Sequence, residues 1–139
     1  MQIIDLLLIE VKYPENVGSI YRLAFQFNIR TIYLYQSAES NRANTYKTER
    51  HIPIIKIDSL EFLTTYPHPK YLLETGESVL TKESISDPVF LIAVANESYG
   101  ASDEQKQYFD QIFSLNAPRR PSYNVSHALA IGLYQIIYE

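Results

Sequence analysis

The sequence predicts an α/β fold in a single domain over residues 1–139, with a mostly parallel sheet and helices on both faces. Short apolar runs rich in Ile, Leu and Val alternate with segments whose apolar residues recur at helical spacing, which is typical of parallel sheets with helical crossovers. The 139 residues are also enough for one domain with a substantial core and too few for two ordinary domains.

The first strand and the first helix are predicted near the N-terminus. The run "IIDLLLIEV" (3–11) is apolar except for Asp5 and Glu10 and predicts a buried strand. The segment "NVGSIYRLAFQFN" follows, and Asn16 is its predicted N-cap. Apolar residues recur there at helical spacing, at Val17, Ile20, Tyr21, Ala24 and Phe27.

The middle of the chain predicts three more strands. "TIYLYQ" (31–36) is followed by a polar stretch, 37–50, that predicts a loop. "IPIIKI" (52–57) predicts a strand, and residues 59–66 predict a short helix. "KYLLET" (70–75) is again a strand by its apolar and aromatic content.

The C-terminal third predicts two further strands and two helices. "PVFLIAVA" (88–95) and "QIFSL" (111–115) are the strands. Ser102 and Gln105 have the spacing of a capping box and predict a helix that ends near Asp110.

The last predicted helix, residues 122–138, is apolar on nearly every side. A helix of this kind is buried on all sides, whereas a terminal surface helix keeps one polar face. Its N-terminal end is polar, with Ser122 as its predicted N-cap and Asn124 in its first turn.

Three polar stretches each follow a predicted strand. They are "YPENVGSIYR", "NESYG" and "NAPRRPSYNVS". Ligands of open α/β sheets bind outside the carboxyl ends of the strands, so these stretches predict a binding site at that edge. Read singly, each also fits an ordinary turn or helix cap.

Several classes of chemistry are excluded. With four Gly residues the chain has neither a P-loop nor a dinucleotide fingerprint, and no Ser lies in a nucleophile-elbow motif. The absence of Cys excludes disulfides and thiolate metal sites, and the three His residues form no ligand motif, so no metal is expected. No apolar run is long enough to span a membrane and "MQIIDLLLIEV" is not typical of a signal peptide, so we expect a cytoplasmic protein.

The charge is acidic overall but unevenly distributed. The net charge of −4 argues against a protein that coats nucleic acid. Residues 22–56 carry six basic and two acidic side chains, whereas residues 58–110 carry three basic and ten acidic ones. The first of these segments predicts either a local basic patch, together with Arg119 and Arg120, or ordinary solvated surface charge.

In order and spacing, the three polar stretches resemble the SpoU family of RNA ribose methyltransferases, within the SPOUT superfamily. "PENVGSIYRLAF" is similar to the family's Asn-x-Gly-x-x-x-Arg helix start, and "LIAVANESYG" to its strand followed by Gly-Asn-Glu-x-x-Gly. "SYNVSHALAIGLY" is similar to Ser-Leu-Asn-Val-Ser followed by small residues. The resemblance covers nearly the whole chain.

The resemblance implies transfer of a methyl group from S-adenosyl-L-methionine to a ribose 2′-hydroxyl of RNA. It also implies a C-terminal trefoil knot, whose loops bind the cofactor, and a homodimer packed through its first and last helices. In that dimer Val125, Leu129 and Ile136 would face the sheet, and Ala130, Tyr134 and Ile137 would meet the partner.

Site residues follow from the same resemblance. Arg22 is the implied catalytic residue, supported by Asn16. The implied cofactor residues are Leu73, Thr75, Ala95, Asn96, Glu97, Gly100, Ser114, Leu115, Ser122, Tyr123 and Asn124.

The substrate is expected to be RNA, and tRNA rather than ribosomal RNA. Larger members of the family append an RNA-binding domain, for which 139 residues leave no room, so the dimer is expected to present its own basic surface. Its candidates are Arg22, Arg30, Arg42, Lys47, Arg50, Arg119 and Arg120.

The sequence departs from the family pattern at Ala95, where a Gly is usual, and at Tyr123, where a Leu is usual. The family's Ser-x-Gly-Ala stretch is not recognisable in "NRANTYKTERHIPI". Two alternatives therefore stay open: a SPOUT-fold dimer that binds RNA or cofactor without catalysis, and an unrelated α/β ligand-binding module.

Overall fold

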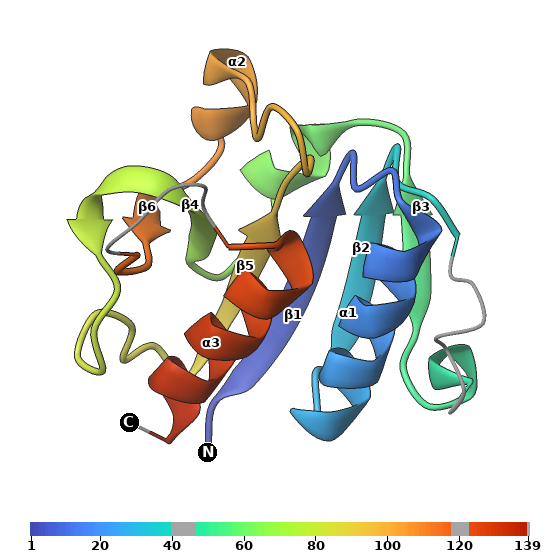
Figure 1. The fold of residues 1–139 in the computed structure, drawn as a ribbon, viewed down its shortest axis with the longest axis horizontal. Coiled ribbons are helices and arrows are strands. Elements are labelled where there is room, and N and C mark those ends of the chain that lie inside the picture. The colour runs from blue at the N-terminus through green and yellow to red at the C-terminus, as the bar shows by residue number, and fades with distance from the viewer. Residues whose placement is uncertain (40–46, 118–122, 139) are drawn as a thin grey trace.

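The fold is a three-layer α/β arrangement built on one six-stranded sheet (Figure 1). The computed structural model describes residues 1–39, 47–117 and 123–138. Every strand pairing among these residues is parallel, and the strand order is β3-β2-β1-β5-β4-β6. The strands are β1 (Ile3–Ile9), β2 (Thr31–Tyr35), β3 (Ile54–Ile57), β4 (Lys70–Val79), β5 (Val89–Val94) and β6 (Gln111–Ser114). The predicted parallel sheet is confirmed.

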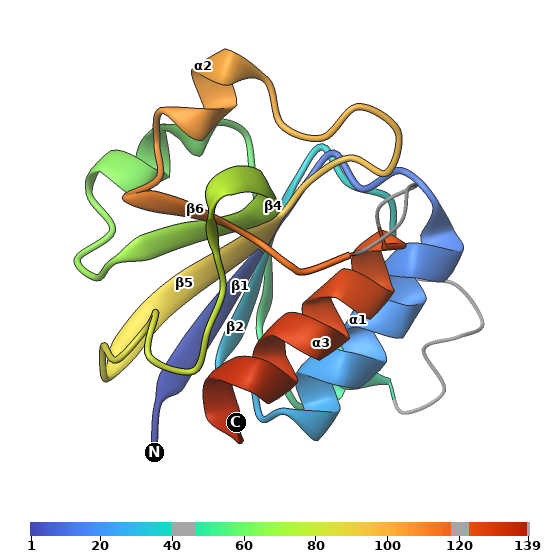
Figure 2. The ribbon, with the colours of Figure 1, turned by 60° about the vertical axis from the view of Figure 1, so that its left-hand side comes forward.

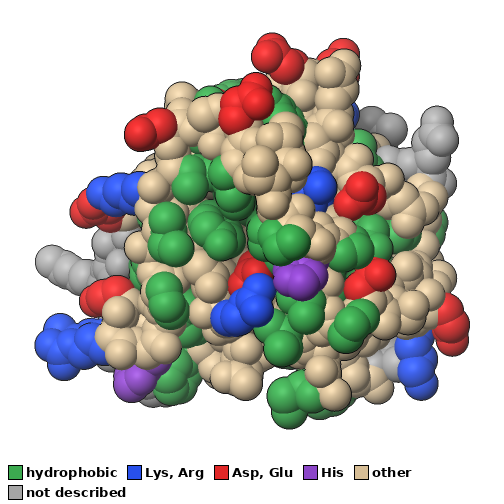
Figure 3. Space-filling model, turned by 180° about the vertical axis from the view of Figure 1, so that it is seen from behind, with side chains coloured by type: hydrophobic (Ala, Val, Ile, Leu, Met, Phe, Trp, Pro, Cys, Tyr) green, Lys and Arg blue, Asp and Glu red, His purple; other side chains and the backbone are tan. Residues whose placement is uncertain are grey.

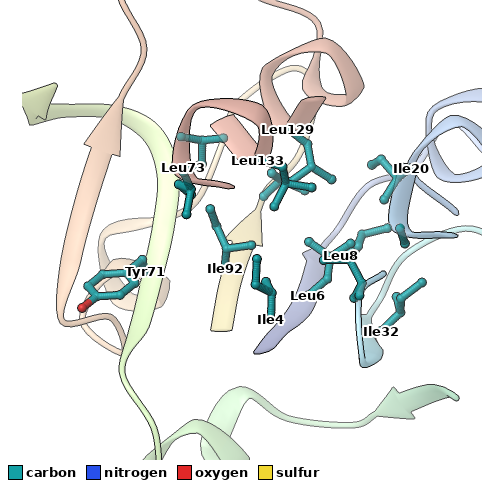
Figure 4. Packing of buried hydrophobic residues seen from close by; sticks show 14 of the residues in the cluster. Ile4, Leu6, Leu8, Ile20, Ile32, Tyr71, Leu73, Ile92, Leu129 and Leu133 are labelled. Carbon is teal, nitrogen blue, oxygen red and sulfur yellow. The ribbon is translucent and has the colours of Figure 1, made fainter. Parts of the chain in front are cut away.

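One face of the sheet is covered by α1 (Pro14–Gln26) and α3 (Val125–Ile137), which lie side by side (Figures 1 and 2). The larger core cluster lies between these helices and the sheet. In Figure 4, Leu129 and Leu133 of α3 point toward Ile92 and Leu73 of the sheet. On the other side of this cluster α1 contributes buried residues at helical spacing, at Val17, Ile20, Tyr21 and Ala24.

The second face is covered more thinly, by the 3-10 helix η2 (Leu60–Thr64) and the four-residue helix α2 (Asp103–Lys106). Seen from behind, hydrophobic side chains reach the surface of this face (Figure 3). Helices on both faces were predicted, but η2 and α2 are each shorter than predicted.

Local hydrogen bonds explain why the two helices are short. In the predicted helix 59–66 the hydroxyls of Thr64 and Thr65 donate to backbone carbonyls three residues earlier, which favours a tight 3-10 turn. The capping box of α2 is present as predicted. The helix ends early because Asp110 pairs with Lys70 at the start of β4, through its backbone N–H and its carboxylate.

Both long helices begin elsewhere than predicted. Pro14 occupies the first turn of α1, which suits its fixed φ and missing N–H, so Tyr13 and not Asn16 is the N-cap. In α3 the N-cap is Asn124, whose side chain accepts from the backbone N–H of Ser126 at 2.9 Å. Ser122, the predicted N-cap, lies outside the described residues.

β4 extends beyond its predicted end by way of a bulge. Leu73 and Ser78 both lie opposite Phe113 of β6, so residues 74–77 leave the regular pairing. This bulge puts Glu74 and Thr75 at the C-terminal edge of the sheet, where the binding site was predicted.

The trefoil knot depends on the segment between β6 and α3. That segment includes residues 118–122, which lie outside the described residues, so the knot stays a prediction. Within the described ranges, no helix has the length and hydrophobicity needed to cross a membrane.

Candidate functional site

A cavity of about 600 Å³ lies at the bulge of β4 and the C-terminal ends of β5 and β6. It is bounded by the bulge of β4, the loop after β5, the end of β6 and the start of α3. Its walls combine backbone, small apolar side chains and a few polar groups. The described lining residues are Leu73, Glu74, Thr75, Val94, Ala95, Asn96, Glu97, Ser98, Tyr99, Gly100, Lys106, Ser114, Leu115, Ala117, Tyr123, Asn124, Val125 and Ala128.

The loop after β5 is closed on itself by Asn96. The side-chain oxygen of Asn96 accepts from the backbone N–H groups of Ser98 at 2.8 Å and Tyr99 at 3.2 Å. Its amide group donates to the backbone carbonyl of Glu10 at 2.7 Å, which ties the loop to the end of β1. Asn96 is buried, so its role is to shape the cavity wall.

Glu10 holds the same loop from outside. Its carboxylate accepts from the hydroxyl of Tyr99 at 2.8 Å and from the side-chain amide of Gln105 at 2.6 Å. The bond from Gln105 has the largest effect and that from Tyr99 the next, and both lower the pKa of Glu10. Contacts within the chain therefore support the loop in this shape.

Gly100 and Glu74 are packed so closely that the loop needs a glycine. Gly100 has a φ of +69°, and a Cβ at this position would collide with the Glu74 carboxylate. That carboxylate accepts from the backbone N–H of Ala101 at 2.5 Å and lies 3.3 Å from the Lys106 ammonium. The second Gly of the motif thus makes room for Glu74, which fastens β4 to the loop.

Glu97 joins the loop to the start of α1. Its carboxylate accepts from the backbone N–H groups of Lys12 at 3.0 Å and Tyr13 at 2.9 Å, and from the side-chain amide of Asn16 at 3.0 Å. Burial by itself raises the pKa of Glu97, but these hydrogen bonds outweigh it and the pKa is lowered. Glu97 therefore stays ionised at neutral pH, beside the positive end of the helix dipole.

Asn16 connects all three sequence motifs. Its amide nitrogen donates to Glu97, and its side-chain oxygen accepts from the amide of Asn124 at 3.2 Å. Asn124 in turn caps α3 by accepting from the backbone N–H and the hydroxyl of Ser126. One chain of hydrogen bonds thus runs from the loop after β5 through α1 to α3.

The structure gathers the sequence-predicted cofactor residues in one place. Ten of them line the cavity, and the eleventh, Ser122, lies outside the described residues. Ala95 is 7% exposed and packs with the core cluster on the second face, which accommodates its methyl group. Tyr123 is held by a hydrogen bond from its hydroxyl to the Asn116 carbonyl at 2.9 Å.

Two charged residues of the site were missing from the predicted set. Glu74 stands inside β4, between the predicted cofactor residues Leu73 and Thr75. Lys106 lies on α2, and only the geometry of the loop brings it to the cavity. An acidic residue inside the apolar run "LLET" is the sequence signal that could have revealed Glu74, and no comparable signal marks Lys106.

Arg22 is exposed on α1 and is not among the described residues that line the cavity. It stands six residues beyond Asn16, or about 9 Å along the helix axis. The structure therefore places the predicted catalytic residue away from the cofactor residues of its own chain.

The predicted RNA-binding residues do not all lie on one surface. Lys47 and Arg50 are exposed at the 3-10 helix η1 (Thr48–Arg50), which is attached to α1 by the Thr48 hydroxyl. Arg30 instead pairs with the buried carboxylate of Asp5 on the second face, at 2.6 Å. Arg42, Arg119 and Arg120 lie outside the described residues.

The outward face of α3 is apolar and uncovered in the single chain. Ile131, Tyr134 and Tyr138 are exposed. A second hollow, of about 550 Å³, is lined by Ala130, Ile131, Tyr134 and Gln135. Ile137, which was predicted to lie on this face, packs partly against the core. One helix face therefore has the composition of an interface.

Known proteins share a family profile and a fold with this chain. The profile of the SpoU rRNA Methylase family matches residues 4–134. A search of curated protein sequences finds no match. Several solved structures superimpose closely, at low sequence identity.

The SpoU methyltransferase AviRb from Streptomyces viridochromogenes matches with a TM-score of 0.84 and 17% identity, over 96% of this chain and 58% of that chain. In complex with AdoMet, AviRb matches with a TM-score of 0.81 and 16% identity, over 97% and 57%. A TrmH/SpoU tRNA modifying enzyme from A. aeolicus matches with a TM-score of 0.81 and 23% identity, over 98% of this chain and 74% of that chain.

A structure described in connection with the 2-OH methylation of C/U34 on tRNA gives a TM-score of 0.82 and 20% identity, over 97% of this chain and 94% of that chain. These likenesses confirm the fold of SpoU methyltransferases. The chain spans less than two thirds of the length of AviRb.

Proposed function

We propose that this chain, which belongs to the SpoU rRNA Methylase family, is an S-adenosylmethionine-dependent RNA ribose 2′-O-methyltransferase of the cytoplasm. The observation that carries the proposal is the hydrogen-bonded chain from Glu97 through Asn16 to Asn124 at the rim of the cavity. It joins the three motifs of the family at one ligand-sized site. Three accidental turn and cap sequences would not be expected to converge in this way.

The cavity fits S-adenosylmethionine by size and by chemistry. Its volume of about 600 Å³ lies within the range of small-molecule sites, roughly 300–1,000 Å³. Adenine needs apolar walls and backbone hydrogen-bond groups, and Leu73, Ala95 and Leu115 bring both. The cofactor, when bound, supplies a methyl group already activated on a positively charged sulfur.

The protein's own residues mainly align the reactants. Alignment of a hydroxyl with an activated methyl group can supply much of the rate enhancement. A guanidinium is in general a poor general base, because it holds its proton well above neutral pH. We therefore assign Arg22 to binding an RNA phosphate and to stabilising the charge that develops on the ribose oxygen.

A homodimer through α1 and α3 is part of the proposal. The exposed residues Ile131, Tyr134 and Tyr138 form an apolar surface on α3, beside α1. Burial of large aromatic and aliphatic side chains is the main source of affinity in stable homodimers. The hollow lined by Ala130 and Tyr134 supplies the relief into which a partner's side chain can fit.

The substrate is proposed to be tRNA. Support comes from the likeness to the A. aeolicus tRNA modifying enzyme and to the structure connected with methylation of C/U34 on tRNA. The second of these has nearly the same length as this chain, of which it matches 97%. Ribosomal RNA is the competing substrate, as the name of the family indicates.

Two experiments test the proposal. Calorimetric titration with S-adenosylhomocysteine should show one site per subunit, and a titration without heat or thermal shift at millimolar ligand would leave only the catalytically silent alternative. Incubation with labelled S-adenosylmethionine and total RNA, followed by mapping of 2′-O-methyl positions, identifies the substrate. Label confined to ribosomal RNA would reject the tRNA assignment and keep the methyltransferase.

A further inference from the structure

Charged side chains line the cavity, and they differ in how many hydrogen-bond and ion-pair partners they have within the chain. Among the described lining residues, three side chains carry a formal charge: Glu74, Glu97 and Lys106. Together they give the cavity wall a net charge of −1. A carboxylate that faces a partly enclosed cavity is screened less by solvent and salt than one on an open surface.

Most of the acceptor capacity of Glu97 is already taken up by contacts within the chain. Its two oxygens accept from three donors at the start of α1. Glu74 has one backbone donor, Ala101, and the Lys106 ammonium at 3.3 Å. An ionised carboxylate accepts at about four lone-pair positions, so Glu74 keeps acceptor capacity for a ligand.

Glu74 is also the more firmly placed member of its ion pair. Its side chain is 17% exposed, against 33% for Lys106, and it is held between the Ala101 N–H and Gly100. The flexible, more exposed ammonium therefore offsets only part of the negative charge that Glu74 brings to the cavity.

We infer that Glu74 makes this cavity prefer a positively charged ligand over a neutral ligand of the same shape. The inference rests on the proposed function. S-adenosylmethionine carries a sulfonium charge, and S-adenosylhomocysteine, its neutral thioether product, differs from it by one methyl group. Glu74 is thus a specificity-determining residue that favours substrate over product.

The charge change follows from the balance of the reaction. Methyl transfer forms a carbon–oxygen bond to the ribose, breaks the sulfur–methyl bond and releases the hydroxyl proton to solvent. The ligand left in the cavity has lost one positive charge. The field of Glu74 no longer favours it, so product is released more readily and competes less with new cofactor.

The test is a pair of dissociation constants, measured by calorimetry without RNA so that no turnover occurs. S-adenosylmethionine and S-adenosylhomocysteine are titrated into the wild type, Glu74→Gln and Lys106→Met. The quantity compared is the ratio Kd(S-adenosylhomocysteine)/Kd(S-adenosylmethionine). Glutamine is isosteric and still accepts from the Ala101 N–H, so Glu74→Gln changes mainly the charge.

The two variants should move the ratio in opposite directions. Glu74→Gln should lower it by roughly three- to tenfold, and Lys106→Met, which removes the offsetting charge, should raise it by a smaller factor. Both effects should shrink at 1 M salt. Lys106→Met leaves the Ala101 contact intact, so it tests the same field even where Glu74→Gln folds poorly.

If Glu74 had a purely structural role, Glu74→Gln would weaken the binding of both ligands equally. The ratio of dissociation constants would then be unchanged, and this result would overturn the inference. So would a ratio that moves in the same direction in both variants. A wild type that binds neither ligand would reject the proposed function along with it. A wild type that binds both, with variants whose ratios match its own, would reject the inference alone.

Discussion

Replacement of Glu97 by alanine should loosen the start of α1 and destabilise the whole domain. The change removes the acceptor of three hydrogen bonds, from the backbone of Lys12 and Tyr13 and from the Asn16 side chain. Each is worth about 1 kcal/mol net, and the two backbone donors are exposed enough for water to restore part of this. Loss of a negative charge beside the N-terminal end of α1 adds about 0.5 kcal/mol.

For Glu97→Ala, the free energy of unfolding should fall by about 2–3 kcal/mol in total. For a domain of this size this loss corresponds to a fall in Tm of about 10 °C. Glu97→Gln retains an acceptor and should lose about half as much. Glu104→Gln removes an exposed carboxylate on α2 and is the matched control, with an expected effect below about 0.5 kcal/mol.

The effect of Glu97→Gln should depend on pH, with a sign fixed by the lowered pKa of Glu97. A carboxyl whose pKa is lower in the folded protein than its ordinary value of 4.5 contributes its stability in full above that value. The contribution is lost as the pH falls through the folded pKa. The gap between wild type and Glu97→Gln should therefore be widest near pH 7 and should narrow below about pH 4.5.

Urea unfolding at pH 7 and at about pH 3.5, followed by circular dichroism, measures both gaps. Equal gaps at the two pH values would show that Glu97 acts by packing and not as an ionised acceptor. No gap at pH 7 would refute the anchoring role of Glu97 altogether.

The remaining predictions concern single residues. Arg22→Ala should abolish methyl transfer and leave affinity for S-adenosylhomocysteine within a few-fold, because Arg22 is not among the described lining residues. Asn124→Ala should weaken that affinity by about fivefold or more, because it removes the cap of α3 and the bond to Asn16, worth about 1 kcal/mol or more. Gly100→Ala should lower Tm and cofactor affinity together, since its Cβ meets Glu74 at a positive φ. Ala130→Glu should give monomers or aggregates in light scattering, and a stable dimer would show that α3 is not the interface.

Predictions that rest on local pattern agree with the structure. The bounds of the six strands lie within two residues of the predicted ones, except the end of β4, which lies four residues later; a short apolar run between polar turns leaves few alternatives. Ten of the predicted cofactor residues line one cavity because their motifs lie at or near strand ends, and parallel strands end at the same edge; their role in binding the cofactor stays a prediction. The capping box of Ser102 was also correct, since it involves neighbours three residues apart.

Features set by contacts distant in sequence were missed. The N–H groups at the start of α1 are satisfied by Glu97, 81 residues beyond Asn16, so no local signal could show that Asn16 is a bridge rather than an N-cap. No local signal showed that Arg30 pairs with Asp5, which lies 25 residues earlier in β1. Lys106 lies 32 residues beyond Glu74, and β5 with the loop that follows it brings the two side chains together.

The order of the strands explains why the site depends on α3. β1 and β5 are neighbours in the sheet, so the loops that follow them meet directly, and Glu97 reaches the start of α1. β6 lies at the edge of the sheet, beyond β4, and the chain that follows it returns to Asn16 only because α3 packs beside α1. Leu129 and Leu133 of α3 fill the core, and their packing against the sheet therefore also holds Asn124 in the site. Stability of the α1–α3 layer and integrity of the cavity are consequently one property of the fold, and damage to the first should appear as loss of ligand affinity.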